Sequence, residues 1–228
     1  MKQEQLERTI GLIGQEGVNK LNNATVLVCG LGGVGGTALE ALARSGVGSF
    51  IIVDFDKVAP SNLNRQILYT AKDIGKNKVD CAASRIKEIN SEVHITPINI
   101  KVDDKFIDSI NQFSIDFIVD AIDDIKGKIF IALFAKQNNI PLITSLGMAN
   151  RLDSSKVSIM RLDKTTHDPL AKKLRYEYKK AGIDTKEIYA AYSSEEPLKD
   201  GTKLNSMMMV PSASGLVIAG YVINKLIN

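Results

Sequence analysis

The sequence predicts an α/β fold built on a doubly wound, mainly parallel β-sheet with an antiparallel C-terminal extension. Between residues 25 and 146, short apolar runs alternate with stretches of helical periodicity, which is the pattern of buried parallel strands joined by crossover helices. After Ser145 this rhythm stops, and residues 157–162 alternate between apolar and polar side chains as an antiparallel strand does. An apolar stretch over residues 212–227 is expected to form a helix that closes the fold.

The first half of the chain supplies the predicted parallel sheet. Residues 6–21 have helical spacing weakened by Gly11, Gly14 and Gly17, which favours two short helices or a helix and a turn. Apolar runs predict strands over residues 25–29, 50–54, 93–99, 115–120 and 141–145. Helical spacing predicts helices over residues 33–45, which Gly46 stops, 75–90, 103–111 and 126–138.

The second half contributes fewer and more varied elements. Asp168 and Pro169 open a helix that extends to Lys180, with the acid as N-cap and proline at the first helical position. A further strand is predicted over residues 188–192. Pro197 and Gly201 indicate a mobile surface loop over residues 195–205.

A glycine-rich turn follows the first predicted strand. Gly30, Gly32 and Gly35 fit the spacing of the turn in Rossmann-like nucleotide-binding units, where glycines allow a tight turn, close phosphate approach and close helix packing. The next helix then offers unpaired N–H groups to an anion. Asp54, at the end of the second strand, is placed to accept hydrogen bonds from a ribose. The turn alone does not separate NAD from ATP.

Composition and charge are those of an ordinary globular protein. The 228 residues include 29 basic and 26 acidic side chains, and this net charge of +3 is too small to argue nucleic-acid binding from the whole chain. Cys29 and Cys81 form no CxxC pair, so neither a zinc site nor a disulfide framework is expected. The N-terminal residues are polar, and Pro211 interrupts the apolar C-terminus. We therefore expect no signal peptide, no membrane span and a cytoplasmic location.

Further polar residues fall at the carboxyl edge of the predicted sheet, where open α/β sheets bind ligands. Arg65 and Lys78 supply cations that can neutralise a triphosphate, above all as pyrophosphate leaves. Asp120 and Asp123 follow a strand and suit a Mg²⁺ ion. Neutral amides for phosphate or substrate come from Asn62 and Asn64. Because a dehydrogenase has no evident use for these groups, they favour ATP.

In order and spacing, these residues resemble the signature of the ThiF/MoeB adenylating enzymes, relatives of the ubiquitin-activating enzyme. The matching segments are 54–56, 61–66, 75–79 and 120–123, within residues 8–147. That family uses ATP and Mg²⁺ to adenylate a carboxylate. The resemblance implies that ATP is held by Gly30, Gly32, Gly33, Gly35, Asp54, Asp56, Ser61, Asn62, Asn64, Arg65, Gln66, Lys78 and Asp123.

The resemblance also implies roles within this set. Arg65 and Lys78 would bind phosphates and Asp123 would handle Mg²⁺, so these three and Arg8 are the expected catalytic residues. Arg8 resembles the family's arginine that reaches the partner subunit's ATP, which implies a homodimer. Many relatives carry two CxxC pairs for zinc, and some carry a cysteine that receives the acyl group. No cysteine follows Cys81, so neither feature is expected.

The second half of the chain resembles one branch of the family, the tRNA threonylcarbamoyladenosine dehydratases, in residues 162–175, 192–195 and 210–216. That branch adenylates the threonyl carboxylate on a modified adenosine beside the anticodon; the ureido group then attacks, and AMP leaves. A tethered nucleophile needs no receiver cysteine, because effective molarities of intramolecular reactions reach about 10⁵–10⁸ M. The candidate tRNA surface is the basic helix that carries Lys172, Lys173, Arg175, Lys179 and Lys180.

The sequence therefore predicts a single ThiF-type domain over residues 1–228 that dehydrates threonylcarbamoyladenosine in tRNA with ATP. Its nucleotide-binding half is residues 1–147, and its substrate half is residues 148–228. One alternative is adenylation of a carrier protein's C-terminus for sulfur transfer, which the missing cysteines disfavour. Others are an NAD-binding oxidoreductase and a non-catalytic scaffold. A sulfur-relay protein is a further partner to consider.

Overall fold

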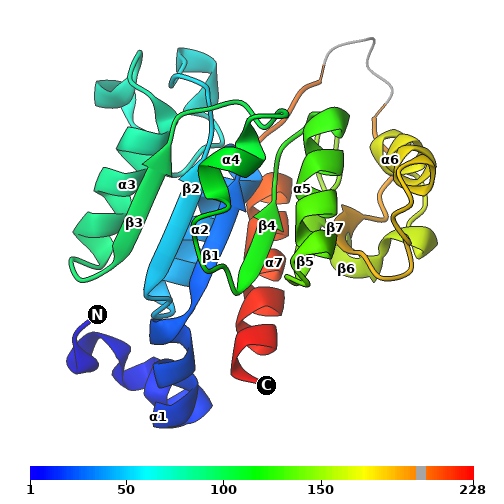
Figure 1. The fold of residues 1–228 in the computed structure, drawn as a ribbon. Helices are drawn as coiled ribbons and strands as arrows, with labels where there is room; N and C mark the ends of the chain where they lie inside the picture. Colours follow the sequence, from blue (N-terminus) through cyan, green and yellow to red (C-terminus); the bar gives the residue numbers. More distant parts are fainter. Residues whose placement is uncertain (199–203) are drawn as a thin grey trace.

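The computed structural model describes residues 1–198 and 204–228, and its centre is a seven-stranded sheet of order β3-β2-β1-β4-β5-β7-β6 (Figure 1). All neighbouring strands are parallel except β6 and β7, which form the predicted antiparallel pair. The strands are β1 (Thr25–Cys29), β2 (Ser49–Val53), β3 (His94–Ile98), β4 (Phe117–Asp120), β5 (Leu142–Ser145), β6 (Val157–Arg161) and β7 (Tyr189–Ser193). The predicted fold class and all seven predicted strands are confirmed, with ends that differ by one or two residues.

Helices cover both faces of this sheet, as in a doubly wound fold. They are α1 (Glu7–Asn23), α2 (Gly33–Arg44), α3 (Lys78–Ile89), α4 (Phe106–Ile110), α5 (Ile125–Gln137), α6 (Pro169–Lys180) and α7 (Met209–Ile227). Alternate residues of β1 point to opposite faces, so Val26 and Val28 pack with α2, α3 and α7, whereas Leu27 and Cys29 pack with α4, α5 and α6. The continuous apolar runs of the sequence reflect this burial on both faces.

The glycine turn between β1 and α2 brings helix and strand into unusually close contact. Gly30 has a φ of +88°, and a Cβ there would lie 2.7 Å from the carbonyl oxygen of Ala121 in the loop after β4. A Cβ on Gly35 would lie only 1.8 Å from the carbonyl oxygen of Gly30. The backbone therefore excludes any larger residue at both positions.

Two of the helices differ from their predicted bounds for physical reasons that the structure shows. Residues 75–77 were predicted as helix, but Asn77 pairs with Lys57 in an isolated β-bridge, so α3 begins at Lys78. Proline is tolerated in a first helical turn, so α7 begins at Met209, before Pro211. Gly14, with φ +73° and ψ 168°, breaks α1 in two, in agreement with the prediction of two short helices.

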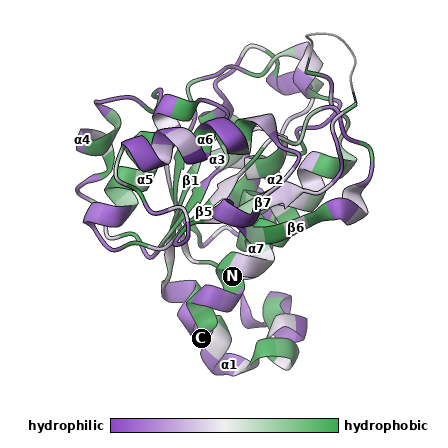
Figure 2. Cartoon of the chain, turned by 90° about the vertical axis from the view of Figure 1, so that its right-hand side faces the viewer, coloured by the Kyte–Doolittle hydropathy of each residue, from purple (hydrophilic) through white to green (hydrophobic). Residues whose placement is uncertain are grey.

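The N-terminal and C-terminal helices occupy different settings. In Figures 1 and 2, α1 projects from the body of the molecule, and Leu12 on it is 85% exposed. In the described part of the chain, α7 is the one helix long and apolar enough to cross a membrane by composition. It lies against α2 and the sheet, however, and buries Val210, Ile218 and Val222 there. This packing favours the predicted closing helix of a core.

The predicted surface loop over residues 195–205 is described only in part. Residues 199–203 lie outside the described residues. Before them, the Glu195 carboxylate accepts hydrogen bonds from the backbone N–H groups of Leu152 and Asp153, and after them Asn205 donates its N–H to the side-chain oxygen of Asn150. Both described ends of the segment are thus attached to the loop that follows β5.

Candidate active site

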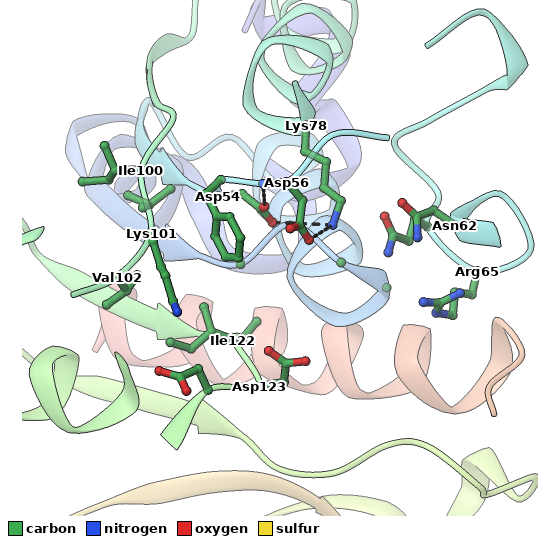
Figure 3. A pocket seen from close by; sticks show the side chains of 18 residues that line it. Asp54, Asp56, Asn62, Arg65, Lys78, Ile100, Lys101, Val102, Ile122 and Asp123 are labelled. Atoms are coloured by element: carbon green, nitrogen blue, oxygen red, sulfur yellow. Dashed lines mark hydrogen bonds and ion pairs between the residues drawn. The ribbon is translucent and has the colours of Figure 1, made fainter. Parts of the chain in front are cut away.

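A cavity of about 300 Å³ opens at the carboxyl ends of β1, β2 and β4, where the strand order reverses direction. Open α/β sheets bind ligands at this point because the loops of neighbouring strands diverge there. The cavity is lined by ten of the residues predicted to hold a nucleotide, and Figure 3 shows the labelled ones around it. They are Gly30, Gly32, Gly33, Asp54, Asp56, Asn62, Arg65, Gln66, Lys78 and Asp123.

The glycine turn is held in place by the residues it faces. The Leu31 N–H donates to Oδ2 of the buried Asp54 at 2.7 Å, and the Tyr69 hydroxyl donates to the Leu31 carbonyl at 3.0 Å. The other Asp54 oxygen accepts the Asp56 N–H at 2.8 Å. A carboxylate oxygen has two lone pairs, so each Asp54 oxygen can accept one more hydrogen bond from a ligand hydroxyl.

Lys78 opens α3 with its ammonium group at the cavity. Its Nζ lies 2.8 Å from Oδ2 of Asp56 and 4.0 Å from Oδ2 of Asp54, while the residue itself is only 5% exposed. A buried cation of this kind needs negative partners, because burial otherwise penalises its charge. The two aspartates supply them, and a phosphate could share this role.

The segment after β2 contains a 3₁₀ turn (Pro60–Asn62), and the polar side chains of Arg65 and Gln66, which follow it, line the cavity. Arg65 donates from its guanidinium to the Ser61 carbonyl at 2.7 Å and to Oδ1 of Asn64 at 2.9 Å, so its charge has no carboxylate partner in the described chain. Gln66 is 6% exposed, and its Oε1 is the one buried side-chain acceptor in the described residues without a hydrogen bond. A site lined by a free guanidinium and an unpaired amide oxygen is incomplete without a polar ligand.

The aspartates after β4 have separate environments, and this corrects one expectation. Asp120 was expected to suit Mg²⁺, but its carboxylate is fully buried and accepts hydrogen bonds from Lys128 Nζ, 3.0 Å from each oxygen, and from the Thr144 hydroxyl at 2.6 Å. Asp124 caps α5 by accepting the Gly127 N–H. Asp123 is exposed and lines the cavity, with no intramolecular hydrogen bond in the described chain.

Sequence reasoning missed the opposite wall of the cavity, which is largely apolar. Ile100, Lys101 and Val102 come from the loop after β3, and Phe55 and Ile122 complete the wall. The Lys101 ammonium lies 6.0 Å from the centre of the Phe55 ring, which is 56% exposed. Apolar residues at a strand end have no distinctive sequence pattern, although the position of this loop at the same sheet edge could have indicated it.

A second, larger cavity of about 760 Å³ adjoins the first, and the two share the charged residues Arg65 and Asp123 together with Gly33, Ala121 and Ile122. Its other walls come from residues 145–151 after β5, from Asp168 to Leu170 at the start of α6, and from residues on both sides of the undescribed segment. Ser61, predicted for the nucleotide, lines this second cavity.

Arg151 ties the walls of the second cavity together. Its side chain is buried beside Asp168, at 3.5 Å, and donates to the carbonyl oxygens of Gly147, His167 and Glu195. Burial lowers the pKa of Arg151, while the Asp168 charge raises it. Asp168 also caps α6 through the Ala171 N–H, as predicted from the sequence. This constellation was not predicted, because its members are far apart in the sequence.

Other predicted residues lie outside the two cavities. Asn64 donates to the Ser206 carbonyl at 2.8 Å and so joins the 3₁₀ turn to the segment before α7, and Gly35 acts through packing. Arg8 is exposed on α1, which precedes β1 at the amino edge of the sheet, opposite the cavities (Figure 1). It therefore does not reach the site of its own chain.

The basic helix α6 is confirmed, and one of its candidate residues has intramolecular partners. Lys172, Lys173, Lys179 and Lys180 are exposed on it. Arg175, however, donates to the carbonyl oxygen of Thr165 at 3.0 Å and to its hydroxyl at 2.6 Å. These bonds use only Nη1 of the guanidinium and fix the loop before the helix, so a phosphate contact through the other nitrogens of Arg175 stays a prediction.

Neither cysteine lies at these two cavities. Cys29 is fully buried in β1, and Cys81 on α3 faces a different groove. Burial raises the pKa of both thiols, the opposite of what an activated nucleophile needs. Of the two histidines, His94 begins the edge strand β3, and His167 pairs with Glu196 at 3.1 Å. Within residues 1–198 and 204–228, no three His, Cys, Asp or Glu side chains form a group that could hold a metal ion.

Comparisons with known proteins agree with this arrangement. The model of the ThiF family matches residues 5–227. A tRNA threonylcarbamoyladenosine dehydratase of Bacillus subtilis is 35% identical over 98% of this chain and 94% of its own. The crystal structure of the E. coli tRNA N6-threonylcarbamoyladenosine dehydratase in complex with ATP superimposes with a TM-score of 0.92 at 30% identity, over 98% of this chain and 93% of its own. A molybdopterin-synthase adenylyltransferase of Salmonella typhimurium is 43% identical, but over only 42% of this chain and 38% of its own.

Proposed function

The chain belongs to the ThiF family, and from that premise we propose that it uses ATP to adenylate and then dehydrate threonylcarbamoyladenosine in tRNA. The observation that carries the proposal is the pair of adjoining cavities with Gly33, Arg65 and Asp123 in their common wall. One cavity suits a nucleotide, and the other has room for a second substrate whose carboxylate meets the nucleotide's phosphates at this wall. The near full-length similarity to named dehydratases supports the choice of substrate.

The first cavity fits ATP by the chemistry of its walls. The glycine turn and the start of α2 offer backbone N–H groups to phosphate. Asp54 accepts from the ribose hydroxyls, and the apolar wall with Phe55 accommodates the adenine. Arg65 and Lys78 supply positive charge, and the unpaired Oε1 of Gln66 can accept a hydrogen bond that the protein itself does not provide.

The reaction follows from placing a carboxylate in the shared wall. A carboxylate oxygen attacks the α-phosphorus of ATP, the bond to the β-phosphate oxygen breaks, and pyrophosphate leaves with its negative charge near Arg65 and Lys78. The ureido group of the same substrate then attacks the activated carbonyl carbon, loses a proton and displaces AMP. The overall change is the loss of one water from the substrate, coupled to conversion of ATP to AMP and pyrophosphate.

Asp123 is proposed as the protein's contribution to a Mg²⁺ site. It is a single carboxylate at the wall between the cavities, without an intramolecular partner in the described chain. Mg²⁺ is commonly held by one or two carboxylates together with substrate phosphates and water, so a site formed only with ATP agrees with this arrangement.

Homodimer formation is proposed to complete the site through Arg8. This exposed residue lies on the projecting helix α1, at the opposite edge of the sheet from its own cavity. A two-fold dimer in which each α1 crosses to its partner would place Arg8 near the partner's nucleotide. The lysines of α6 are proposed to contact tRNA phosphates, and a cytoplasmic location is proposed because the substrate is tRNA.

Nucleoside mass spectrometry tests the proposal directly. The protein is incubated with ATP, Mg²⁺ and tRNA that carries threonylcarbamoyladenosine, and the digested tRNA is analysed. The expected result is a nucleoside lighter by one water, formed with an equal amount of AMP. A known dehydratase acting on the same tRNA is the positive control. Unchanged nucleoside, when this control converts its substrate, would contradict the proposal.

A second candidate is adenylation of a carrier protein's C-terminal carboxylate for sulfur transfer, which the partial similarity to a molybdopterin-synthase adenylyltransferase favours. Pyrophosphate exchange into ATP that depends on a carrier protein ending in Gly-Gly, and not on tRNA, would select this function. In that case a sulfur-relay protein becomes the expected partner.

A further inference from the structure

The exposed face of α6 carries one aromatic residue among lysines. Tyr176 is 66% exposed and makes no hydrogen bond in the described chain. Lys172 and Lys173 precede it by one helical turn, and Lys179 and Lys180 follow it by one turn, so all five share a face. The opposite face buries Ala171, Leu174 and Tyr178. In Figure 2, α6 lies at the front, on the side of the molecule turned toward the viewer.

This face leads directly to the second cavity. Pro169 lines that cavity and lies seven residues, or two turns, before Tyr176, so both residues lie on the same side of the helix. The rise of a helix places them about 10 Å apart along its axis. The Asp168 cap and its contact with Arg151 fix the helix start against the cavity wall. The exposed face of α6 is therefore a rigid continuation of the cavity rim.

We propose that Tyr176 is a stacking platform for an unpaired nucleotide next to the modified adenosine, with the four lysines bound to the flanking phosphates. Proteins recognise single-stranded RNA in this way, through aromatic rings that stack on bases inside a positively charged surface. None of the four lysines has an ion-pair partner among the described residues, so their charge is available to phosphate. A stacked strand spans the distance of about 10 Å from cavity to ring in about three nucleotides.

This inference rests on the proposed function and adds what that function leaves open, namely how the enzyme selects an adenosine in an unpaired loop. In a duplex, neighbouring base pairs stack on both faces of a base and so hide the face that Tyr176 would contact; the platform therefore favours single-stranded surroundings. The platform acts on RNA binding and does not touch ATP.

The first test compares Tyr176→Ala with Tyr176→Phe in binding an RNA hairpin with threonylcarbamoyladenosine in its loop. Loss of a stacking ring is expected to weaken binding by about tenfold, whereas the phenylalanine variant binds as the original protein does. The dependence of binding on salt stays unchanged in both, because no charge is removed, and ATP binding by calorimetry is unaltered. Wild-type affinity in the alanine variant, or equal weakening in both variants, would overturn the platform.

The second test uses the absence of tryptophan from the sequence. Tyr176→Trp introduces a single tryptophan, whose fluorescence can be excited selectively and which the hairpin is expected to quench upon stacking. A matched control is Lys87→Trp, at an exposed position of α3 on the far side of the sheet, which should not be quenched. If the Tyr176→Trp variant is saturated with the hairpin and its tryptophan fluorescence is not quenched, the inference is contradicted.

Product formation by the wild-type protein is measured in parallel. If the wild-type protein forms cyclised nucleoside and the Tyr176 variants bind RNA as the wild type does, only the platform is rejected. If the wild-type protein neither binds the RNA nor forms product, the proposed function is rejected as well.

Discussion

At the scale of single residues, some polar side chains near the cavities are already paired within the protein, whereas others are left for ligands. Asp120 and Asp124 are occupied by intramolecular hydrogen bonds, whereas Asp123, Arg65 and Gln66 Oε1 keep unused capacity toward the cavities. This division could not be read from the sequence, in which the aspartates near residue 120 look alike.

Removal of charge at the cavity is expected to slow adenylation. Arg65→Ala, Lys78→Ala and Asp123→Asn should each lower the rate of AMP formation by about 10²–10³, because such groups stabilise the departing pyrophosphate more than bound ATP. Lys76→Ala is the matched control, since Lys76 lies two residues before Lys78, is exposed and, among the described residues, has Asp73 as its one ion-pair partner, at 3.4 Å. Near wild-type turnover in all three site variants would refute the assignment.

The buried pair of Asp120 and Lys128 is expected to matter for stability. Lys128→Met leaves a carboxylate without its cation at a fully buried position, which should lower the free energy of unfolding by about 3–5 kcal/mol. Adding Asp120→Asn removes the uncompensated charge and should recover part of this loss, because the amide can still bond to Thr144. Urea denaturation measures both, and a double variant no more stable than Lys128→Met would contradict this account.

The cysteines are expected to be dispensable for chemistry. A Cys29→Ala, Cys81→Ala variant should retain a substantial part of the wild-type rate, because both thiols are buried away from the cavities. Any loss of rate should be accompanied by a loss of thermal stability, since Cys29 packs in the core. Accumulation of acyl-adenylate without cyclised product in the folded variant would instead point to a thioester route.

At the scale of elements, the sequence was most informative where a pattern has one physical origin. The strand and helix order follows from apolar periodicity, and the nucleotide edge follows from Gly30 and Asp54 at strand ends, from Arg65 in the long connection after β2 and from Lys78 at the start of α3. The cavity wall at residues 100–102 was missed because its apolar side chains resemble any buried loop. The intramolecular contact of Arg175 was missed because a basic pattern on α6 does not reveal that one guanidinium turns back to Thr165.

Charge reversal on α6 is expected to affect RNA binding selectively. Replacing Lys172, Lys173 and Lys179 with Glu should weaken tRNA binding and reduce the slope of log affinity against log salt by roughly 0.7–0.9 for each phosphate that the protein no longer neutralises. Lys87→Glu on α3 is the control for a change in charge elsewhere. A Lys172, Lys173, Lys179 variant with the original slope would place the RNA surface on another element.

At the scale of the whole molecule, the two ends of the sheet have different roles. The cavities open at the carboxyl edge, and α1 with Arg8 projects at the amino edge. Because of this separation, Arg8 can reach only the cavity of another molecule. In an isologous two-fold dimer, each subunit would place its Arg8 at the partner's cavity, and the partner's Arg8 would lie at its own.

Complementation between two inactive variants tests this exchange. Arg8→Ala and Lys78→Ala should each be nearly inactive, but a mixed dimer contains one site with its own Lys78 and Arg8 from the partner. Activity should partly return after the two proteins are mixed and allowed to exchange subunits. A fully active monomer by light scattering at the assay concentration would rule out the shared site.

The common wall of the two cavities also has a consequence for inhibition. Because Gly33, Arg65 and Asp123 border both spaces, a single compound could occupy them together, with a non-hydrolysable link in place of the reacting bond. Such a compound would lose its translational freedom only once, so its affinity could approach the product of the affinities of its halves. A compound of this kind would also distinguish this protein from other ATP-binding enzymes, since the nucleotide half is shared widely, whereas the second cavity takes much of its wall from residues 148–211.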